Sequence, residues 1–272
     1  MRQSAPYERP APPRRRVHRA GRALEQSRVR LNRVYLDAPL SSGSLIELPA
    51  AAAQHLGKVL RARSGDELVL FTGDGREFTA VIESIRGSRV TASVGAGRAI
   101  DRESPLAVTL VQCIARADRM DVIVQKATEL GVVRIVPVMS RRSVVRLDAA
   151  QAASKAGHWH AIAVSACEQC GRNRLPAIEA PRQLTRYLGE APPGGARLVL
   201  EPDAGSSRAA VEIGAAVEIA IGPEGGFDPE ELEAFRLSGF ASVALGPRVL
   251  RTETAAIAAL AWLQSQYGDF RS

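Results

Sequence analysis

The segment IGPEGGFDPEEL, residues 221–232, joins a hydrophobic run to the start of a helix. The run VEIAI that leads into it has the β-branched composition of a buried strand. Asp228 can cap a helix that has Pro229 at its first position and two glutamates near its positive end. The glycines between strand and helix allow a sharp bend or the close approach of a ligand. In open α/β sheets, ligands bind at such turns.

The same alternation of strand and helix extends from residue 106 toward the C-terminus. Strands are predicted at 107–114, 132–139, 196–200, 217–221 and 241–245, and helices at 119–130, 155–170, 229 onward and 252–267. Gly131 and Gly171 are placed to end the first two helices. Alternating strands and helices predict a largely parallel sheet over residues 106–272.

The preceding region, residues 30–97, is predicted to be mostly β-structure. LNRVYL is a short strand, and residues 65–94 contain three strand-like runs with turn signals at Asp74-Gly75 and Gly87-Ser88. Between them, PAAAAQHLGKVLRAR predicts a short helix that leads into a basic strand or turn. We expect a small β-barrel with one helix, followed by the polar segment GRAIDRESP as a linker.

The net charge of +7 belongs mostly to the N-terminal segment. Residues 1–29 contain eight arginines and two glutamates, a charge of +6, so the rest of the chain carries only +1. The prolines and the scarcity of apolar residues in residues 1–29 predict that this segment is a disordered tail. This tail could help to hold RNA, could be a dispensable extension or the product of a misplaced start codon, or could be a transit peptide; it lacks the apolar core of a signal peptide.

Several common kinds of site are absent from the sequence. It contains no GxxxxGK[ST] phosphate loop and no GxGxxG between a strand and a helix. Cys167 and Cys170 form a single CxxC at a helix end, which is a weak signal for zinc or redox chemistry, so we expect no metal. Three cysteines are too few for a disulfide framework, and no apolar run reaches membrane-spanning length, so we expect a cytoplasmic protein without membrane association.

Three glycine-bearing loops each follow a predicted strand near the C-terminus: LEPDAG, IGPEGGF and LGPRVLR. Loops after neighbouring parallel strands meet at one edge of a sheet, where bare backbone can hydrogen-bond a planar ring. The loops could equally be tight strand-to-helix turns, and spacing alone leaves both interpretations open.

IGPEGGF followed by LGPRVLRTETAAIAAL resembles the C-terminal signature of the SPOUT-class RNA methyltransferases. More narrowly, it resembles the RsmE family, the 16S ribosomal RNA uracil-N3 methyltransferases. Four other segments match in the family's order, and together the matches span nearly everything from Arg30 onward: HLGKVLRARSGDELVLFTGDGREF, DRMDVIVQKATELGVVRIVPVMSRRS, HWHAIAVSACEQCGRNRLP and LVLEP.

The resemblance implies an α/β fold and a homodimer. A PUA-like RNA-binding barrel would precede a SPOUT domain, with a parallel sheet, helices on both faces and a deep trefoil knot. Folding rules disfavour knots, so the knot is implied by the resemblance alone.

The resemblance also implies the cofactor S-adenosylmethionine, held among the three glycine-bearing loops. Its expected contacts are Leu198, Leu200, Gly222, Gly225, Leu245, Gly246, Leu250, Thr254 and Ala255. Glu168, Gln169 and Arg172 match the family's EQ..R pattern and, with Arg251, would face the target uridine. Cys170 departs from the family, which usually has a small hydroxyl residue there.

The implied reaction is methylation of N3 of a specific uridine, U1498 in the family, in 16S ribosomal RNA of the small subunit. Glu168 or Glu253 could accept the N3 proton, or Arg172 or Arg251 could stabilise the uracil anion. The assembled subunit is the expected substrate, and free RNA stays open. The alternatives are a SPOUT methyltransferase with another ribosomal or transfer RNA target, and a non-catalytic ribosome-assembly factor.

Two groups of basic residues are candidates for RNA contact. One consists of Arg141, Arg142 and Arg146, and the other of Arg30, Arg33, Lys58, Arg61 and Arg63. Each group could instead be a solvated face. Phosphate contacts from them would supply affinity with little sequence preference.

Overall fold

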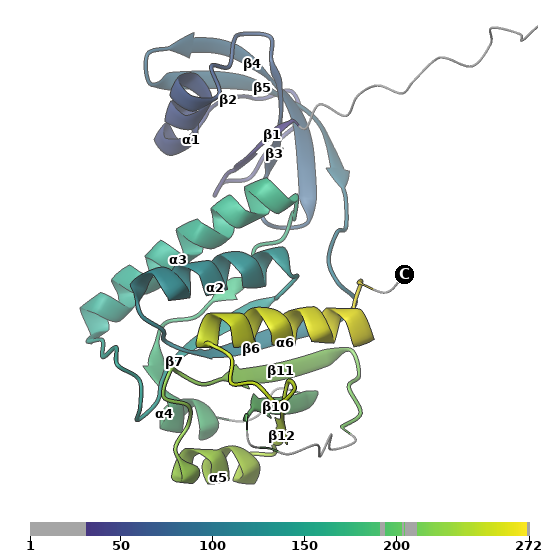
Figure 1. The fold of residues 1–272 in the computed structure, drawn as a ribbon. Helices are drawn as coiled ribbons and strands as arrows, with labels where there is room; N and C mark the ends of the chain where they lie inside the picture. The colour runs from purple at the N-terminus through teal and green to yellow at the C-terminus, as the bar shows by residue number, and fades with distance from the viewer. Residues whose placement is uncertain (1–30, 191–193, 203, 205–210, 271–272) are drawn as a thin grey trace, which may run out of the picture. The chain divides into compact units, whose positions relative to one another are not determined.

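The structure is a computed structural model, and it describes residues 31–190, 194–202, 204 and 211–270 (Figure 1). The tail predicted over residues 1–29 and the candidate RNA contact Arg30 lie outside these residues. Leu31–Ser272 form one compact unit.

The N-terminal part of this unit is built on a five-stranded sheet of order β1-β3-β4-β5-β2. Its strands are β1 (Asn32–Tyr35), β2 (Leu45–Glu47), β3 (Glu67–Phe71), β4 (Arg76–Arg86) and β5 (Arg89–Ala99). β1 and β3 are parallel and the other pairs antiparallel. The expected short helix is α1 (Ala50–Gln54), continued by a π-helical turn at His55–Val59. The predicted strands are present as β1, β3, β4 and β5, and β5 takes up residues 97–99 of the expected linker. The three-residue strand β2 was not predicted.

The C-terminal part contains a seven-stranded sheet in which every pair is parallel. Its strands are β6 (Ala107–Cys113), β7 (Arg134–Met139), β8 (Ala177–Ile178), β9 (Arg182–Gln183), β10 (Ala196–Leu200), β11 (Ala216–Ile221) and β12 (Ala241–Val243). They follow the order β12-β10-β11-β6-β7-β8, and β9 also pairs with β7. The short strands β8 and β9 were not predicted, because two residues carry no readable periodicity.

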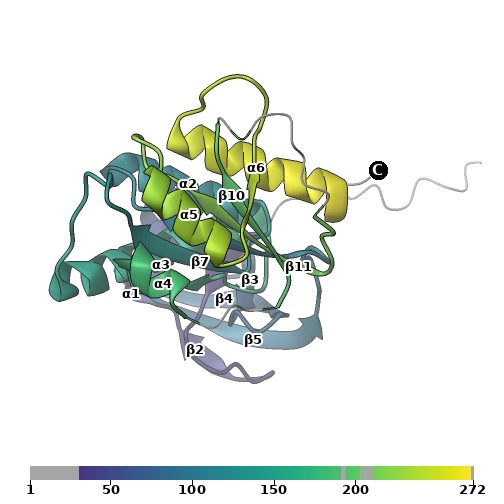
Figure 2. The same ribbon diagram turned by 90° about the horizontal axis from the view of Figure 1, so that it is seen from below.

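Helices cover both faces of this sheet, as Figures 1 and 2 show. α2 (Ala117–Glu129), α3 (Ala149–Cys170) and α6 (Thr252–Tyr267) lie on one face, and α4 (Leu184–Leu188) and α5 (Pro229–Leu237) lie on the other. In β6, Val108 and Leu110 belong to the core under the first group, whereas Val111 and Cys113 belong to the core under the second. The expected doubly covered parallel sheet is confirmed, and the knot stays a prediction.

Local signals explain the ends of α3 and the start of α5. Asp228 caps α5 through a reciprocal capping box with Glu231, as the sequence predicts. α3 ends at Gly171, whose φ of 93° places it in the left-handed region. α3 begins well before the predicted Lys155, because Asp148 and Gln151 form a second capping box that the sequence analysis did not use.

Candidate functional site

The described parts of the loops that follow β10, β11 and β12 meet at the carboxyl edge of the parallel sheet and line a cavity of about 350 Å³. These are the three glycine-bearing loops of the sequence analysis. The first residues of α6 complete the wall. The cavity therefore lies where ligands bind in open parallel sheets, and its volume is in the range of small-molecule sites.

The loop after β11 is folded as a tight turn. The Gly226 amide donates to the Pro223 carbonyl at 2.9 Å, and Gly226 has a φ of 66° that favours glycine. The Thr252 hydroxyl on α6 donates to the Gly222 carbonyl at 2.7 Å. From the segment after β7, Arg142 Nη1 donates to the Gly225 carbonyl at 3.0 Å. The loop is thus held from two other parts of the chain.

Seven of the nine predicted cofactor contacts line the cavity: Leu200, Gly222, Gly225, Leu245, Gly246, Leu250 and Ala255. The other two do not. Leu198 lies in the hydrophobic core with 1% of its surface exposed, because side chains alternate along β10. Thr254 is exposed on α6, and Thr252 lines the cavity in its place.

Gly222 also has a packing reason to be glycine. A Cβ there would lie 3.3 Å from two ring carbons of Phe227, whereas a Cβ at Gly225 would lie 3.6 Å from Arg142 Cβ. At Gly222 the absence of a side chain therefore serves the packing of the turn as well as leaving room for a ligand.

Charged side chains also line the cavity. Glu201, Glu224 and Arg248 were not among the predicted site residues, and Arg142 was predicted as an RNA contact rather than a cavity residue. Arg119 Nη1, on α2, lies 3.0 Å from Glu224 Oε1 in a partly exposed ion pair, and Arg119 Nε lies 3.9 Å from Glu253 Oε1. Glu201 and Arg248 lie inside the motifs LEPDAG and LGPRVLR, so the motifs themselves were the available signal. The cavity combines apolar walls, bare backbone and both signs of charge.

The residues expected to face the uridine are not gathered at this cavity. Glu168 Oε1 accepts from the Tyr35 amide of β1 at 3.0 Å, and burial raises the pKa of its carboxyl. Gln169 is exposed on α3, and Arg251 is exposed at the N-cap of α6, beside the cavity residues Leu250 and Thr252.

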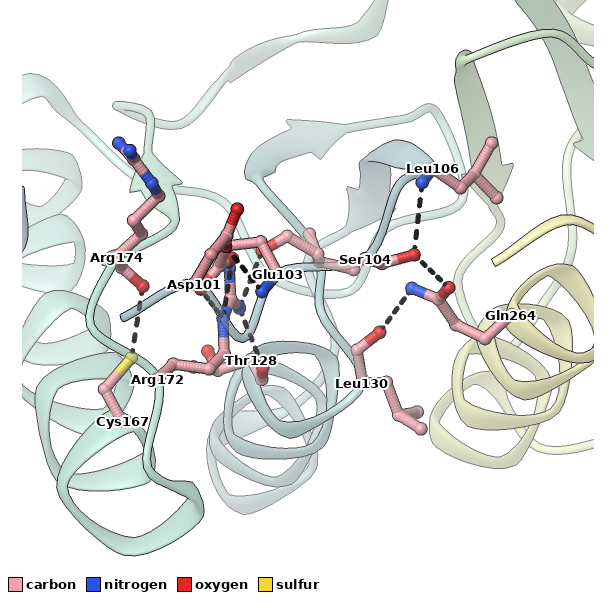
Figure 3. A network of polar contacts seen from close by, with 11 residues as sticks. Asp101, Glu103, Ser104, Leu106, Thr128, Leu130, Cys167, Arg172, Arg174 and Gln264 are labelled. Atoms are coloured by element: carbon pink, nitrogen blue, oxygen red, sulfur yellow. Dashed lines mark hydrogen bonds and ion pairs between the residues drawn. The ribbon is translucent and has the colours of Figure 1, made fainter. Parts of the chain in front are cut away.

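Arg172 does not fit its expected role (Figure 3). Only 5% of its side chain is exposed. Its Nε and Nη2 donate to the Glu103 carboxylate, and Nη1 donates to the carbonyls of Thr128 at 2.8 Å and Val132 at 3.0 Å. All three nitrogens already have acceptors inside the chain, and these contacts favour a structural role for Arg172. Its expected contact with the uridine stays a prediction that this geometry does not support.

The candidate RNA-binding arginines have mixed surroundings. Arg33 is buried against Glu77, 2.8 Å away, with 8% of its side chain exposed, so it is not available to RNA. Arg141 pairs with Asp228 and Glu230 on the first turn of α5, acids that the sequence does not place beside it. Arg146 donates to the carbonyls of Ser140 and Arg141.

Lys58, Arg61 and Arg63 are all exposed and follow one another in the segment after α1. These three residues therefore remain candidate RNA contacts, and RNA contact by either basic group stays a prediction.

The two cysteines of the CxxC interact with each other. Their proximity lowers the pKa of Cys170 and raises the pKa of Cys167. The Cys167 thiol donates to the Arg174 carbonyl at 3.6 Å. Over the described residues, no group of three or more His, Cys, Asp or Glu is placed to hold a metal ion.

Comparison with known proteins identifies the family. The profile of the RNA methyltransferase domain matches residues 102–264, and that of the RNA methyltransferase PUA domain matches residues 48–95. The ribosomal RNA small subunit methyltransferase E of Buchnera aphidicola subsp. Schizaphis graminum is 33% identical over 241 residues, which cover 88% of this chain and 98% of that protein. The chain belongs to the ribosomal RNA small subunit methyltransferase E family.

Two similar solved structures share the fold of this chain. The Neisseria gonorrhoeae ribosomal RNA small subunit methyltransferase E, bound to S-adenosyl methionine, is 37% identical with a TM-score of 0.82. A Legionella pneumophila structure, described as a methyltransferase in complex with the cofactor SAM, is 42% identical with a TM-score of 0.84. Each comparison covers 89% of this chain and 100% of the other. None of the described helices is long and apolar enough to cross a membrane.

Proposed function

We propose that this protein transfers a methyl group from S-adenosylmethionine to N3 of one uridine in 16S ribosomal RNA, the position U1498 of the family. The cavity enclosed by the three glycine-bearing loops carries the proposal. The two similar structures with this cofactor bound support it.

The residues at the cavity fit this cofactor. Leu200, Leu245 and Leu250 provide apolar walls for a planar ring, and the bare backbone at Gly222 and Gly225 can come close to it. Glu201 and Glu224 are carboxylates at the same cavity, suited to the cofactor's positive charges. When bound, S-adenosylmethionine supplies an electrophilic methyl group, so the chain has only to position the uracil and remove the N3 proton.

Two carboxylates are candidates to accept that proton. Glu168 has a raised pKa, which makes it a stronger base than an ordinary carboxylate once it is ionised. Glu253 follows the cavity residue Thr252, and its buried Oε2 has no hydrogen-bond partner among the described residues. Arg251, exposed at the same helix end, is the remaining cationic candidate to stabilise the uracil anion, and Gln169 is a candidate hydrogen-bond partner of the base.

The remaining assignments also belong to this proposal. Residues 30–97 would bind RNA, residues 106–272 would carry the reaction, and the active form would be a cytoplasmic homodimer that acts on the assembled small subunit. The matching PUA profile over residues 48–95 supports RNA binding.

Nucleoside mass spectrometry of ribosomal RNA tests the proposal. A strain that lacks this protein should lose 3-methyluridine from its 16S RNA, and the parent gene should restore it. Incubating purified protein and labelled S-adenosylmethionine with either free 16S RNA or assembled small subunits then identifies the substrate. Loss of a different modified nucleoside would indicate another target. A full set of modifications together with no cofactor binding would indicate a non-catalytic factor.

A further inference from the structure

A fully buried glutamine lies beside the start of the cavity loop. Gln112, near the end of β6, is 0% exposed and pairs across the sheet with Ile221, the residue before Gly222. Its Nε2 donates to the Cys113 carbonyl at 2.9 Å and to Thr252 Oγ1 at 3.0 Å. Its Oε1 has no partner among the described residues. Burying an amide that is only half satisfied is costly, so the position calls for an explanation.

The hydrogen bond to Thr252 gives this amide a connection to the cavity. A hydroxyl that accepts a hydrogen bond directs its own hydrogen elsewhere. Thr252, which is 3% exposed, donates that hydrogen to the Gly222 carbonyl at 2.7 Å. The two hydrogen bonds therefore run in one direction, with Gln112 donating to Thr252 and Thr252 donating to Gly222. Consecutive hydrogen bonds of this kind strengthen one another.

We propose that Gln112 is a positioning residue for the cofactor, which acts through Thr252 to hold the Gly222 carbonyl and with it the loop that lines the cavity. The inference rests on the proposed function, because it assumes that S-adenosylmethionine is the ligand. Gln112 itself does not line the cavity, so it acts without touching the cofactor. Without the amide, the Thr252 hydroxyl can rotate and the loop loses a fixed carbonyl.

A second buried glutamine provides a matched control. Gln264 is also 0% exposed and lies on α6, the helix that carries Thr252 (Figure 3). Its Nε2 donates to the Leu130 carbonyl at 2.8 Å, and its Oε1 accepts from the Ser104 hydroxyl at 2.6 Å. Gln264→Leu therefore removes the same buried group from α6, at a residue that does not line the cavity.

Calorimetric affinities for S-adenosylmethionine test the proposal in the full-length protein. Gln112→Leu and Thr252→Val should each weaken binding about tenfold, equal to about 1.4 kcal/mol. Thr252→Ser keeps the hydroxyl and should stay within about threefold of the parent. The double variant Gln112→Leu with Thr252→Val should be no weaker than either single variant, because both remove one chain of bonds. Gln264→Leu should bind as the parent does, even if it melts at a lower temperature.

Hydrogen exchange in the cofactor-free protein gives a readout independent of binding. The amides of Gly225, Gly226 and Phe227 should exchange faster in Gln112→Leu and Thr252→Val than in the parent or in Gln264→Leu. If the parent does not bind S-adenosylmethionine, the proposed function fails while the exchange data still test the relay. Unchanged exchange in folded Gln112→Leu, or an equal loss of affinity in Gln264→Leu, would overturn the inference. If Gln112→Leu does not fold, the contrast between Thr252→Val and Thr252→Ser decides it.

Discussion

Arg172 and Glu103 form an ion pair in which only 5% of the arginine and 13% of the glutamate side chain are exposed. The same guanidinium binds two backbone carbonyls, of Thr128 at the end of α2 and of Val132 just beyond it. One side chain thereby joins the segment before β6, the end of α2 and the residue after the C-cap of α3. A side chain that links three segments in this way is expected to stabilise the fold rather than to bind the substrate.

Arg172→Ala should therefore act on stability. Removing one partner leaves the Glu103 carboxylate and the two carbonyls without their donor, which should lower the free energy of unfolding by about 3–5 kcal/mol. The single-turnover methylation rate of the folded fraction, at saturating cofactor, should stay within a few-fold of the parent. Denaturant unfolding and single-turnover assays check the two statements separately.

Arg174→Ala is the control, because Arg174 is exposed two residues further on. Its unfolding free energy should change little. A folded Arg172→Ala protein with a methylation rate about 100-fold lower would restore the uridine-facing role that the EQ..R pattern suggests.

The contrast between Arg172 and the glycine loops shows what this sequence can and cannot predict. Strand ends, glycines and helix caps are local signals, so the three loops and the capped start of α5 could be predicted from the residues, whereas most of the cavity contacts came from the resemblance to the RsmE family. The partner of a side chain is not local. Nothing in the sequence places Glu103 beside Arg172 or Glu77 beside Arg33, because those pairs form only when distant segments pack.

Glu168→Gln should change both stability and its dependence on pH. Burial raises the pKa of the folded-state carboxyl above its unfolded value, so the folded protein binds more protons in the window between the two. The stability of the parent therefore falls as pH rises through that window, and the glutamine variant lacks this loss. The difference in melting temperature between Glu168→Gln and the parent should therefore favour the variant more at about pH 8 than at about pH 4. At about pH 4 the pH is below the ordinary glutamate pKa.

The same variant tests the proton acceptor. If Glu168 takes the N3 proton, Glu168→Gln should lower the methylation rate by about 10²-fold or more while cofactor affinity is kept. A parental rate in this variant would transfer the role to Glu253, for which Glu253→Gln is the matched experiment.

Gly222→Ala should be rescued by a smaller residue at Phe227. The new Cβ would lie 3.3 Å from two ring carbons of Phe227, tight enough to force a shift of that side chain or of the loop. We expect a loss of about 1–3 kcal/mol in unfolding free energy together with weaker cofactor binding. Gly225→Ala is the control for stability only, since its Cβ would make ordinary contacts, the nearest at 3.6 Å to Arg142.

The double variant Gly222→Ala with Phe227→Leu separates packing from ligand contact. It should recover most of the stability and the cofactor affinity that Gly222→Ala loses. If stability returns but binding does not, the Cβ at position 222 obstructs the cofactor directly.

Cys170 should be the most reactive thiol at neutral pH. Its pKa is lowered by the neighbouring Cys167 thiol, whereas burial raises the pKa of Cys113 to about 12. Because the thiolate is the nucleophile, alkylation of Cys170 should rise with pH to a plateau with a midpoint below the ordinary thiol value. Mass spectrometry after iodoacetamide treatment measures the rate at each site. Cys167→Ala should move the midpoint upward, and a parental midpoint at the ordinary thiol value of about 8.5 would contradict the assignment.

Replacing Lys58, Arg61 and Arg63 together by glutamine should weaken RNA binding in a salt-dependent way. All three side chains are exposed in one short segment after α1. If each neutralises one phosphate, the slope of log affinity against log salt concentration should become shallower by about 2 to 3. Filter binding to small-subunit RNA over a range of salt concentrations measures the slope. The control replaces Arg89, Arg186 and Arg236 by glutamine. This removes the same amount of positive charge, but each of these arginines is paired with a glutamate. This control should leave the slope nearly unchanged, and an equal loss in both triple variants would mean that RNA responds to net charge rather than to this segment.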